Sequence, residues 1–506
     1  MNDFFGAARR GTVYLVGAGP GDAGLITQRA LQLVRSADVL FIDRLVPREL
    51  AEAGRGDAAR IDVGKTAGDH AMPQEQINER IVEEALAGRS VVRIKGGDPY
   101  LFGRGGEEAI ACRDAGVPFE VVPAVTSAFA ACADAGIPVT HRDIARNVTV
   151  VTASAGRDGQ GDPDYGWLAQ SDGTVVLLMG LRRIGHVAQR LIEAGAPADR
   201  PVAVISRGTT SEQRTVTGTL ASIAAVVAEA QLPSPAIIVV GDVVHLRDQL
   251  NWFERRPLFG TRIAVTRARA QSSTLAAALT ELGAQVVEVP TIRIERLDPA
   301  PLDAAIAELA PGQTLVLTSV NGGEALFDRL AATGNDARRL FGVRIAVVGD
   351  ATAELCRRHG IVADLLPPEG ARTSAGLLQE LRRERLDGHL VTIVRAEHGD
   401  DTLLDGLRDA GAHVALVAAY RTVVDTATPE QVAALVAADL VTFSSASTVR
   451  HAVAMAAGAP LPPAITIGPT TTAAADVAGL TVLGEARVPG VPALVDAVLA
   501  HVTQRV

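Results

Sequence analysis

Short apolar runs alternate with amphipathic stretches along most of the chain. VYLVGAG at 13–19 is followed by LITQRALQLVRSA at 25–37 and then by DVLFID at 38–43. Apolar strands that alternate with amphipathic helices are typical of α/β proteins, in which crossover helices join parallel strands. We therefore predict an α/β fold with largely parallel sheets.

The alternation is interrupted near 255–260, where the sequence reads RRPLFG. Before this point, SPAIIVVGDVVHLRDQLNWF predicts a strand and a closing helix. After it, TRIAVTRARAQSSTLAAALTELGA starts again with a strand, a turn and a helix. We place a domain boundary here, which gives a first domain at 1–256 and a second at 261–506.

The second domain repeats itself. RIAVTRA from Arg262 returns as LVTIVRA from Leu390, TSVN at 318–321 returns as SSAS at 444–447, and a Val-Gly turn with Thr352 returns as an Ile-Gly turn with Thr471. Matched units in one order predict two similar α/β lobes that form a cleft.

The turns of this repeat are rich in hydroxyl groups. Such a turn at a helix N-terminus presents N–H and O–H donors to anions, although an isolated one is more often a helix cap. Their recurrence in both lobes favours an acidic ligand held between the lobes. The candidate binding residues are Ser319, Asn321, Ser445 and Thr471.

Composition excludes several classes of protein. Hydrophobic residues make up 48% of the chain and the net charge is −10, so it is neither disordered nor a non-specific nucleic-acid binder. The N-terminus has no apolar signal segment, and no run is long enough to span a membrane. The three cysteines are far apart, which predicts a reducing, cytoplasmic location. No set of metal ligands is evident, because nothing near His70 and His141 completes a set of metal ligands.

Lysine is rare in this chain. Only two of the 48 basic residues are lysines, Lys65 and Lys95, and all the others are arginine. A lysine kept against this bias can serve where arginine does not, for example by giving up a proton. The alternative interpretation is that these two lysines have been retained by chance and have no special role.

The turn GAGPGD at 17–22 is rich in glycine but does not predict a dinucleotide site. Asp22 stands where the third glycine of a dinucleotide-binding fingerprint belongs, and Pro20 removes one N–H from the turn. The turn lets a ligand approach the backbone closely, without indicating phosphate binding.

A set of motifs in the first domain resembles one family over residues 11–253. In chain order they are VLFIDRLV (39–46), VGKTAGDHAMPQEQIN (63–78), VVRIKGGDPYLFGRGGEEA (91–109), VPAVTSAFAA (122–131), GIPVTHRDIA (136–145), VVLLMGL (175–181), PVAVISRGTTSEQR (201–214) and SPAIIVVGDVV (234–244). Together they resemble uroporphyrinogen-III C-methyltransferase. The resemblance implies a two-lobed tetrapyrrole methylase fold, S-adenosylmethionine as cofactor, and a homodimer formed through this domain.

The resemblance also implies which residues touch the cofactor. They are Pro20, Gly96, Gly97, Asp98, Leu101, Thr126, Ser127, Met179 and Gly208. The residue types suit this role, since glycines admit a ligand close to the backbone and methionine offers a soft apolar surface.

The reaction implied is transfer of a methyl group from a sulfonium to a pyrrole carbon, after which a proton must leave the macrocycle. The resemblance indicates Asp43 as proton acceptor and Lys65 as proton donor. The alternative for Asp43 is a structural ion pair with Arg44 or Arg93. Lys95 is expected to position the glycine turn.

Four arginines are candidates to grip the carboxylates of the substrate, because a guanidinium matches a carboxylate in shape. They are Arg44, Arg104, Arg142 and Arg146; for each, a solvated surface arginine is the alternative. The sequence departs from the family at Thr66, Ala124, Ser154 and Ala155, which bears on substrate contacts and rate.

The second domain resembles uroporphyrinogen-III synthase over about 261–502. The resemblance lies in LTSVNGGEAL, VVGDATAELCRRHGI, VAAYRTV, VTFSSASTVRHAV and ITIGPTTTAAA. It implies two flavodoxin-like lobes, one made of 261–293 with 422–503 and the other of 294–421. It implies that Tyr420 assists departure of the hydroxyl of hydroxymethylbilane, the alternative being a buried hinge residue.

We therefore hypothesise a bifunctional enzyme that closes hydroxymethylbilane to uroporphyrinogen III and methylates it twice to precorrin-2, toward sirohaem or cobalamin. Two alternatives remain open. The first domain methylates another tetrapyrrole position or is a weakened enzyme, or the second domain is a non-catalytic module that senses tetrapyrroles.

Overall fold

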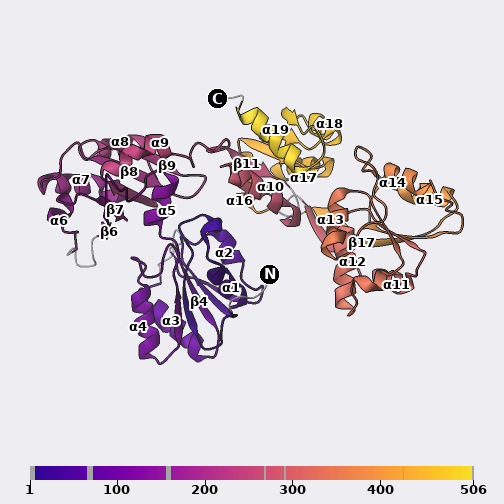
Figure 1. Ribbon diagram of the computed structural model, residues 1–506, viewed down its shortest axis with the longest axis horizontal. Coiled ribbons are helices and arrows are strands. Elements are labelled where there is room, and N and C mark those ends of the chain that lie inside the picture. The colour runs from indigo at the N-terminus through magenta and orange to yellow at the C-terminus, as the bar shows by residue number, and fades with distance from the viewer. Residues whose placement is uncertain are drawn as a thin grey trace. The chain divides into compact units, whose positions relative to one another are not determined.

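A computed structural model describes residues 6–64, 72–154, 161–266, 269–289, 292–424 and 427–503. Lys65, Thr66, His70 and Ala155 lie outside these residues. The chain forms two compact units, the first ending at Thr261 and also containing Thr280–Gln285, and the second holding the remainder. Each unit has two five-stranded sheets covered by helices, so the predicted α/β fold is confirmed (Figure 1).

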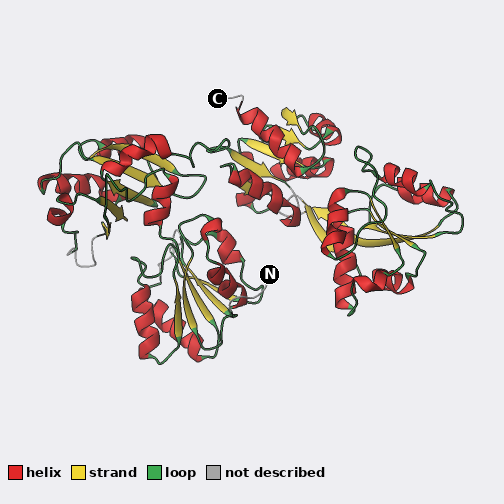
Figure 2. Cartoon of the chain, viewed as in Figure 1, coloured by secondary structure: helices red, strands yellow, loops and turns green. Residues whose placement is uncertain are grey.

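The first sheet of unit 1 is parallel and buried on both faces. Its strand order is β3-β2-β4-β1-β5, and alternate residues of β1 point into two separate cores. Helices α1 and α2 cover one face, and α3 and α4 cover the other (Figure 2). This double burial explains why the VYLVG segment is apolar throughout. The elements are β1 (Val13–Gly17), η1 (Ala23–Leu25), α1 (Gln28–Ser36), β2 (Val39–Ile42), α2 (Arg48–Glu52), β3 (Ala59–Asp62), α3 (Gln74–Leu86), β4 (Val91–Lys95), α4 (Gly105–Asp114) and β5 (Phe119–Val122).

The second sheet of unit 1 is mixed, in the order β6-β7-β10-β8-β9. β6 and β7 run parallel, whereas β10 is antiparallel to both β7 and β8. One face is covered by α6, α7 and α8, and the other by α5. The elements are α5 (Ser127–Asp134), β6 (Val148–Thr152), α6 (Tyr165–Ala169), β7 (Thr174–Leu178), η2 (Leu181–Arg183), α7 (Ile184–Glu193), β8 (Pro201–Ser206), β9 (Arg214–Thr219), α8 (Ile223–Ala230), β10 (Ala236–Val240), η3 (Asp242–Leu246) and α9 (Arg247–Leu250).

Unit 2 contains a sheet built from both ends of the second half of the chain. Its order is β12-β11-β18-β19-β20, in which β11 pairs in parallel with β18, with Ile263 opposite Leu440. The elements are β11 (Arg262–Val265), α10 (Arg269–Glu281), β12 (Gln285–Glu288), α16 (Pro429–Val436), β18 (Leu440–Phe443), α17 (Ala446–Ala456), β19 (Ala464–Thr466), α18 (Pro469–Val477), β20 (Val482–Glu485) and α19 (Val491–Thr503).

The other sheet of unit 2 has the order β13-β17-β16-β14-β15. The connecting strands β13 and β17 pair antiparallel from Ile292 opposite Val424 to Arg296 opposite Tyr420. The expected lobe limits therefore fall within these two strands, which belong to one sheet. The elements are β13 (Ile292–Arg296), α11 (Ala300–Glu308), β14 (Thr314–Leu317), α12 (Val320–Ala332), η4 (Ala337–Leu340), β15 (Arg344–Val347), α13 (Asp350–Arg358), α14 (Ser374–Leu381), β16 (Leu390–Ala396), α15 (Thr402–Asp409) and β17 (His413–Val424).

Among the described helices, none is both long and apolar enough to cross a lipid bilayer. The described residues also contain no group of three or more His, Cys, Asp or Glu side chains placed to hold a metal ion. The three cysteines are free and buried. Burial raises the pKa of the Cys132 thiol to about 12 and that of Cys112 to about 11, so these two stay protonated at neutral pH.

Candidate functional site

Two glycine turns meet at the carboxyl edge of the parallel sheet in unit 1. The turns follow β1 and β4, which are neighbours although the chain forms β2 and β3 between them. Gly97 N–H donates to Gly19 O at 2.8 Å, and Gly19 N–H donates to Gly97 O at 3.3 Å. Ligands of open α/β sheets bind at such a reversal of strand order, outside the carboxyl ends of the strands.

Asp98 binds a third turn, the one that follows β5, to the two glycine turns. Its Oδ1 accepts the Tyr100 N–H at 2.9 Å, and its Oδ2 accepts the Ala124 N–H at 3.0 Å. A Cβ added to Gly17 would lie 2.5 Å from the Cβ of Ala124. The methyl group of Ala124 fits here because Gly17 has no side chain.

Helix α5 joins the first lobe of unit 1 to the second. Thr126, directly after the third turn, caps this helix by accepting the Ala128 N–H at 3.3 Å, and Ser127 is its first residue. Further along, Ala131 packs so tightly on the second lobe that a Cβ added to Gly208 would lie 2.3 Å from its Cβ. Gly208 therefore packs against α5, the helix that begins with Thr126 and Ser127.

The turns after β1 and β8 also touch directly. Asp22 N–H donates to Thr209 Oγ1 at 3.2 Å, although 187 residues separate them. Pro20 lies in the first of these turns and Gly208 in the second. The predicted site is therefore bordered by both lobes of unit 1.

Residues with a positive φ gather in the turns that follow the strands of unit 1. Seven described residues other than glycine have a positive φ, and two of them end helices α8 and α17. The other five follow β4, β7 or β8: Phe102, Arg104, Met179, Arg207 and Thr209. Strain of this kind persists where the surrounding structure fixes it, and it clusters at ligand sites.

These turns fit an adenosine-containing sulfonium cofactor. Gly97 has a φ of +68°, and no atom lies within 4 Å of where its Cβ would stand, so a ligand can lie against its backbone. Met179 exposes about half of its side chain at the second lobe's edge. Backbone polar groups beside an apolar side chain suit an adenine ring and its ribose.

Asp43 is the candidate proton acceptor, and it directly follows β2 at the same sheet edge. Its side chain is 35% exposed, and its Oδ1 lies 3.1 Å from Nη2 of Arg93, which is 2% exposed. Arg44, the other partner considered, is exposed beside Gly64. The structure therefore places a carboxylate that is open on one side and held by a buried guanidinium on the other.

Arg93 belongs to a buried cluster of charged groups centred on Glu108 of α4. Arg93 Nε lies 3.0 Å and Lys95 Nζ 2.9 Å from Glu108 Oε1, which also accepts from Gln74 Nε2 at 3.1 Å. Burial, reinforced by the nearby Arg93 charge, lowers the pKa of Lys95. Lys95 O accepts the Ala18 N–H at 2.8 Å, which ties the cluster to the turn after β1.

The four candidate carboxylate-binding arginines are all exposed. Arg104 directly precedes α4, and its Nη2 lies 2.6 Å from Glu107 Oε2. Arg146 Nε donates to the carbonyl of Arg142 at 3.2 Å. The structure thus joins Arg142 and Arg146 in one turn and leaves Arg44 and Arg104 in separate loops of the first lobe.

Asp134, the last residue of α5, gives a prediction on stability. Burial raises the pKa of its carboxyl to about 6, and Asp22 adds to this effect while Arg256 opposes it. The folded state therefore holds a proton that the unfolded state has lost, and stability falls as pH rises from about 4 to 6. We expect Asp134→Asn to stabilise the chain by about 1 kcal/mol at pH 8 and to have no effect near pH 4.

Thermal unfolding at both pH values measures this effect. Asp114→Asn, at the exposed end of α4, is the matched control and should change stability little at either pH. An equal shift of Asp134→Asn at pH 4 and pH 8 would contradict the assignment.

In unit 2, a cavity of about 350 Å³ lies at the carboxyl ends of β14 and β16. Tyr420 and Ser319 both line it, and their hydroxyl oxygens are 2.9 Å apart. Tyr420 is otherwise buried, at 6% exposure. Arg395 and His398, which the sequence did not single out, also line this cavity.

The other predicted binding residues of unit 2 lie apart from this cavity. Asn321, in the first turn of α12, accepts Arg296 Nη1 on its carbonyl at 2.7 Å. Ser445 caps α17 in the other sheet's lobe. Thr471 is 3% exposed inside α18, and its neighbour Thr472 bonds to Thr466 Oγ1 at 2.6 Å.

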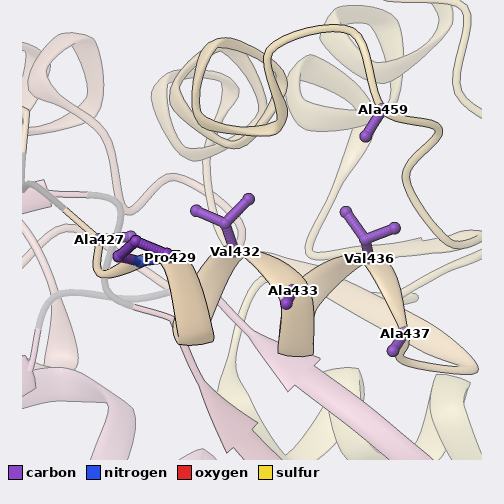
Figure 3. Close-up of a pocket in the computed structure, with 7 residues that line it drawn as sticks. All are labelled: Ala427, Pro429, Val432, Ala433, Val436, Ala437 and Ala459. Carbon is purple, nitrogen blue, oxygen red and sulfur yellow. The ribbon is translucent and has the colours of Figure 1, made fainter.

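A further cavity in unit 2, of about 650 Å³, is lined by no group that can perform chemistry. It is an open groove along α16, lined by alanine, valine and proline side chains (Figure 3). The candidate sites are therefore the glycine turns of unit 1 and the hydroxyl-lined cavity of unit 2.

Comparisons with known proteins match both halves of the chain. Residues 12–224 match the family of tetrapyrrole (corrin/porphyrin) methylases, and residues 273–496 match uroporphyrinogen-III synthase HemD. The porphyrin biosynthesis protein HemD of Ruminiclostridium josui is 38% identical over 476 residues, which cover 92% of this chain and 93% of that protein. Siroheme synthase 2 of Aeromonas hydrophila is 48% identical over 263 residues, which cover 52% of this chain and about half (55%) of that protein.

A solved structure also matches part of the chain. Uroporphyrin-III C-methyl transferase from Thermus thermophilus, complexed with S-adenosylhomocysteine, is 38% identical, with a TM-score of 0.40, and covers 46% of this chain and 99% of that one.

The chain belongs to the family of two-domain proteins in which a tetrapyrrole methylase precedes a uroporphyrinogen-III synthase. Both resemblances seen in the sequence are thereby confirmed. The chain is an enzyme with a methylase domain and a synthase domain.

Proposed function

We propose that unit 2 closes hydroxymethylbilane to uroporphyrinogen III and that unit 1 methylates this product twice to precorrin-2, on the route to sirohaem or cobalamin. The observation that carries the proposal is the convergence of the glycine turns and Asp43 at one sheet edge. Siroheme synthases that share the first half of this chain support the route, although the chain spans about half their length.

In the methylase site, the protein's main task is to align donor and acceptor. S-adenosylmethionine supplies the methyl group and its own leaving group. We assign its binding to Pro20, the Gly96–Asp98 turn, Leu101, Thr126, Ser127, Met179 and Gly208. Asp43 accepts the proton that the macrocycle loses, and Lys65 is assigned as proton donor.

The substrate's carboxylates are assigned to the exposed arginines of the same unit: Arg44, Arg104, Arg142 and Arg146. Guanidinium groups bind carboxylates through two parallel hydrogen bonds. The resemblance to C-methyltransferases also supports a homodimer through the first domain, and light scattering on the purified chain tests it. A reducing cytoplasm suits the three free cysteines.

In the synthase site, we assign Tyr420 to the departure of the hydroxyl of hydroxymethylbilane. Its phenol oxygen lies 2.9 Å from the Ser319 hydroxyl in a cavity that Arg395 and His398 also line, and the role we assign to it is to donate one hydrogen bond. The turns that contain Ser319, Asn321, Ser445 and Thr471 are assigned to contacts with the substrate.

Tyr420→Phe removes this donor and keeps the ring that fills the core. We expect the rate of type III formation to fall about 10-fold, since one hydrogen bond is lost in the transition state. Tyr165→Phe is the matched control, because Tyr165 is buried in unit 1 with an unpaired hydroxyl. Equal rates for the Tyr420→Phe variant and the wild type would remove Tyr420 from the mechanism.

Product analysis with hydroxymethylbilane alone tests the synthase activity. The proposal predicts the type III isomer at a rate proportional to enzyme concentration. Formation of only the spontaneous type I isomer would show that unit 2 binds tetrapyrroles without converting them.

A further inference from the structure

Asp43 is held by a guanidinium that is itself fixed on all sides. Arg93 donates from Nε to Glu108 Oε1 at 3.0 Å, from Nη1 to Ile94 O at 3.0 Å, and reaches Asp43 Oδ1 from Nη2 at 3.1 Å. Ile94 O also accepts the backbone N–H of Asp43 at 3.2 Å. Arg93 therefore contacts the side chain of Asp43 directly, and it shares the Ile94 carbonyl with the backbone N–H of Asp43.

The charges in this cluster balance only when Asp43 is included. Arg93 and Lys95 bring two positive charges to the single carboxylate of Glu108, and these three side chains are at most 2% exposed. Asp43 is the one member that reaches solvent. A buried charge needs a partner, so the cluster draws the Asp43 carboxylate inward through Oδ1.

We propose that Arg93 is a positioning residue for methyl transfer, which fixes the Asp43 carboxylate by Oδ1 so that Oδ2 faces the substrate. The inference rests on the proposed role of Asp43 as proton acceptor. Lys95 directly precedes the cofactor turn and shares Glu108 with Arg93. Within one cluster, Arg93 therefore contacts the proposed proton acceptor Asp43, and Lys95 leads into the cofactor turn.

Lysine at position 93 keeps the charge but has a single nitrogen in place of the planar fork, so it cannot hold all three acceptors at once. A displacement of about 1 Å at a reacting group costs on the order of 10²-fold in rate. We expect Arg93→Lys to lower kcat by about 10- to 100-fold. The KM for S-adenosylmethionine and the calorimetric Kd for S-adenosylhomocysteine should change by less than about threefold, because the cofactor turn is left in place.

A double-mutant cycle with Asp43→Asn tests whether Arg93 acts through Asp43. If it does, Arg93→Lys adds no further loss of kcat in the Asp43→Asn background. Arg247→Lys is the matched control, because Arg247 is largely buried with Glu254 in the second lobe. It should alter thermal stability without altering kcat.

A second variant, Arg93→Gln, guards against failure of Arg93→Lys to fold, because Glu108 keeps Lys95 as its partner at 2.9 Å and the buried charges stay balanced. It should show the same loss of kcat as Arg93→Lys. Wild-type kcat in either variant, additive losses in the cycle, or a fall in cofactor affinity as large as the fall in kcat would overturn the proposal. Full activity of Asp43→Asn would instead overturn the proposed role of Asp43.

Discussion

Replacing Asp43 with asparagine is expected to lower kcat for methyl transfer by about 10²- to 10⁴-fold, the usual contribution of a positioned acid or base. Asparagine has the same shape and can still accept from Arg93 Nη2, but its amide does not take up a proton at neutral pH. The KM for S-adenosylmethionine should stay close to the wild-type value, since Asp43 lies on a different loop from the glycine turns. Steady-state formation of the methylated product measures both quantities.

Asp62→Asn is the matched control for this variant. Asp62 ends the neighbouring strand β3, and its Oδ1 accepts the Gly64 N–H at 2.8 Å, a bond that an asparagine oxygen can also make. We expect kcat within about twofold of the wild type. If Asp43→Asn and Asp62→Asn have the same kcat, the acceptor must be another group.

Replacing Glu108 with glutamine is expected to destabilise unit 1 by about 3–5 kcal/mol, because it leaves Arg93 and Lys95 buried without their shared carboxylate. In this variant, burial and the charge of Arg93 still lower the pKa of Lys95. The Glu108 carboxylate, which raises that pKa in the wild type, is absent. The folded state then binds fewer protons than the unfolded state, so the loss of stability should shrink as pH rises above neutrality.

Glu107→Gln is the control, since Glu107 precedes Glu108 on the same helix but is half-exposed in its pair with Arg104. Its cost should be below about 1 kcal/mol. Denaturant unfolding at pH 7 and pH 9 measures both variants. Equal stability of the two variants would show that the cluster does not depend on the Glu108 charge.

The adjacent pair Glu107 and Glu108 shows where prediction from sequence ends. The alternation of apolar and polar segments predicts the strands and the parallel sheets, because a strand buried on both faces must be apolar throughout. It does not say which of two neighbouring glutamates faces the core. One side chain is 51% exposed and the other is fully buried, and only the packing of α4 on β4 decides between them.

The candidate sites also combine features that the sequence predicts with features that only the fold reveals. Glycine turns at strand ends are visible in the sequence, and the structure joins them through Gly19 and Gly97. The bond between Ser319 and Tyr420 spans 101 residues and depends on which strands are neighbours. The hydroxyl pattern also does not distinguish a residue facing a ligand from one facing the core, as the buried Thr471 shows.

The most direct test of the account supplies the intact chain with hydroxymethylbilane and methyl-labelled S-adenosylmethionine together. The account predicts precorrin-2, a type III macrocycle that carries two labelled methyl groups. Recovery of an unlabelled macrocycle, or of label on a type I macrocycle alone, would contradict it.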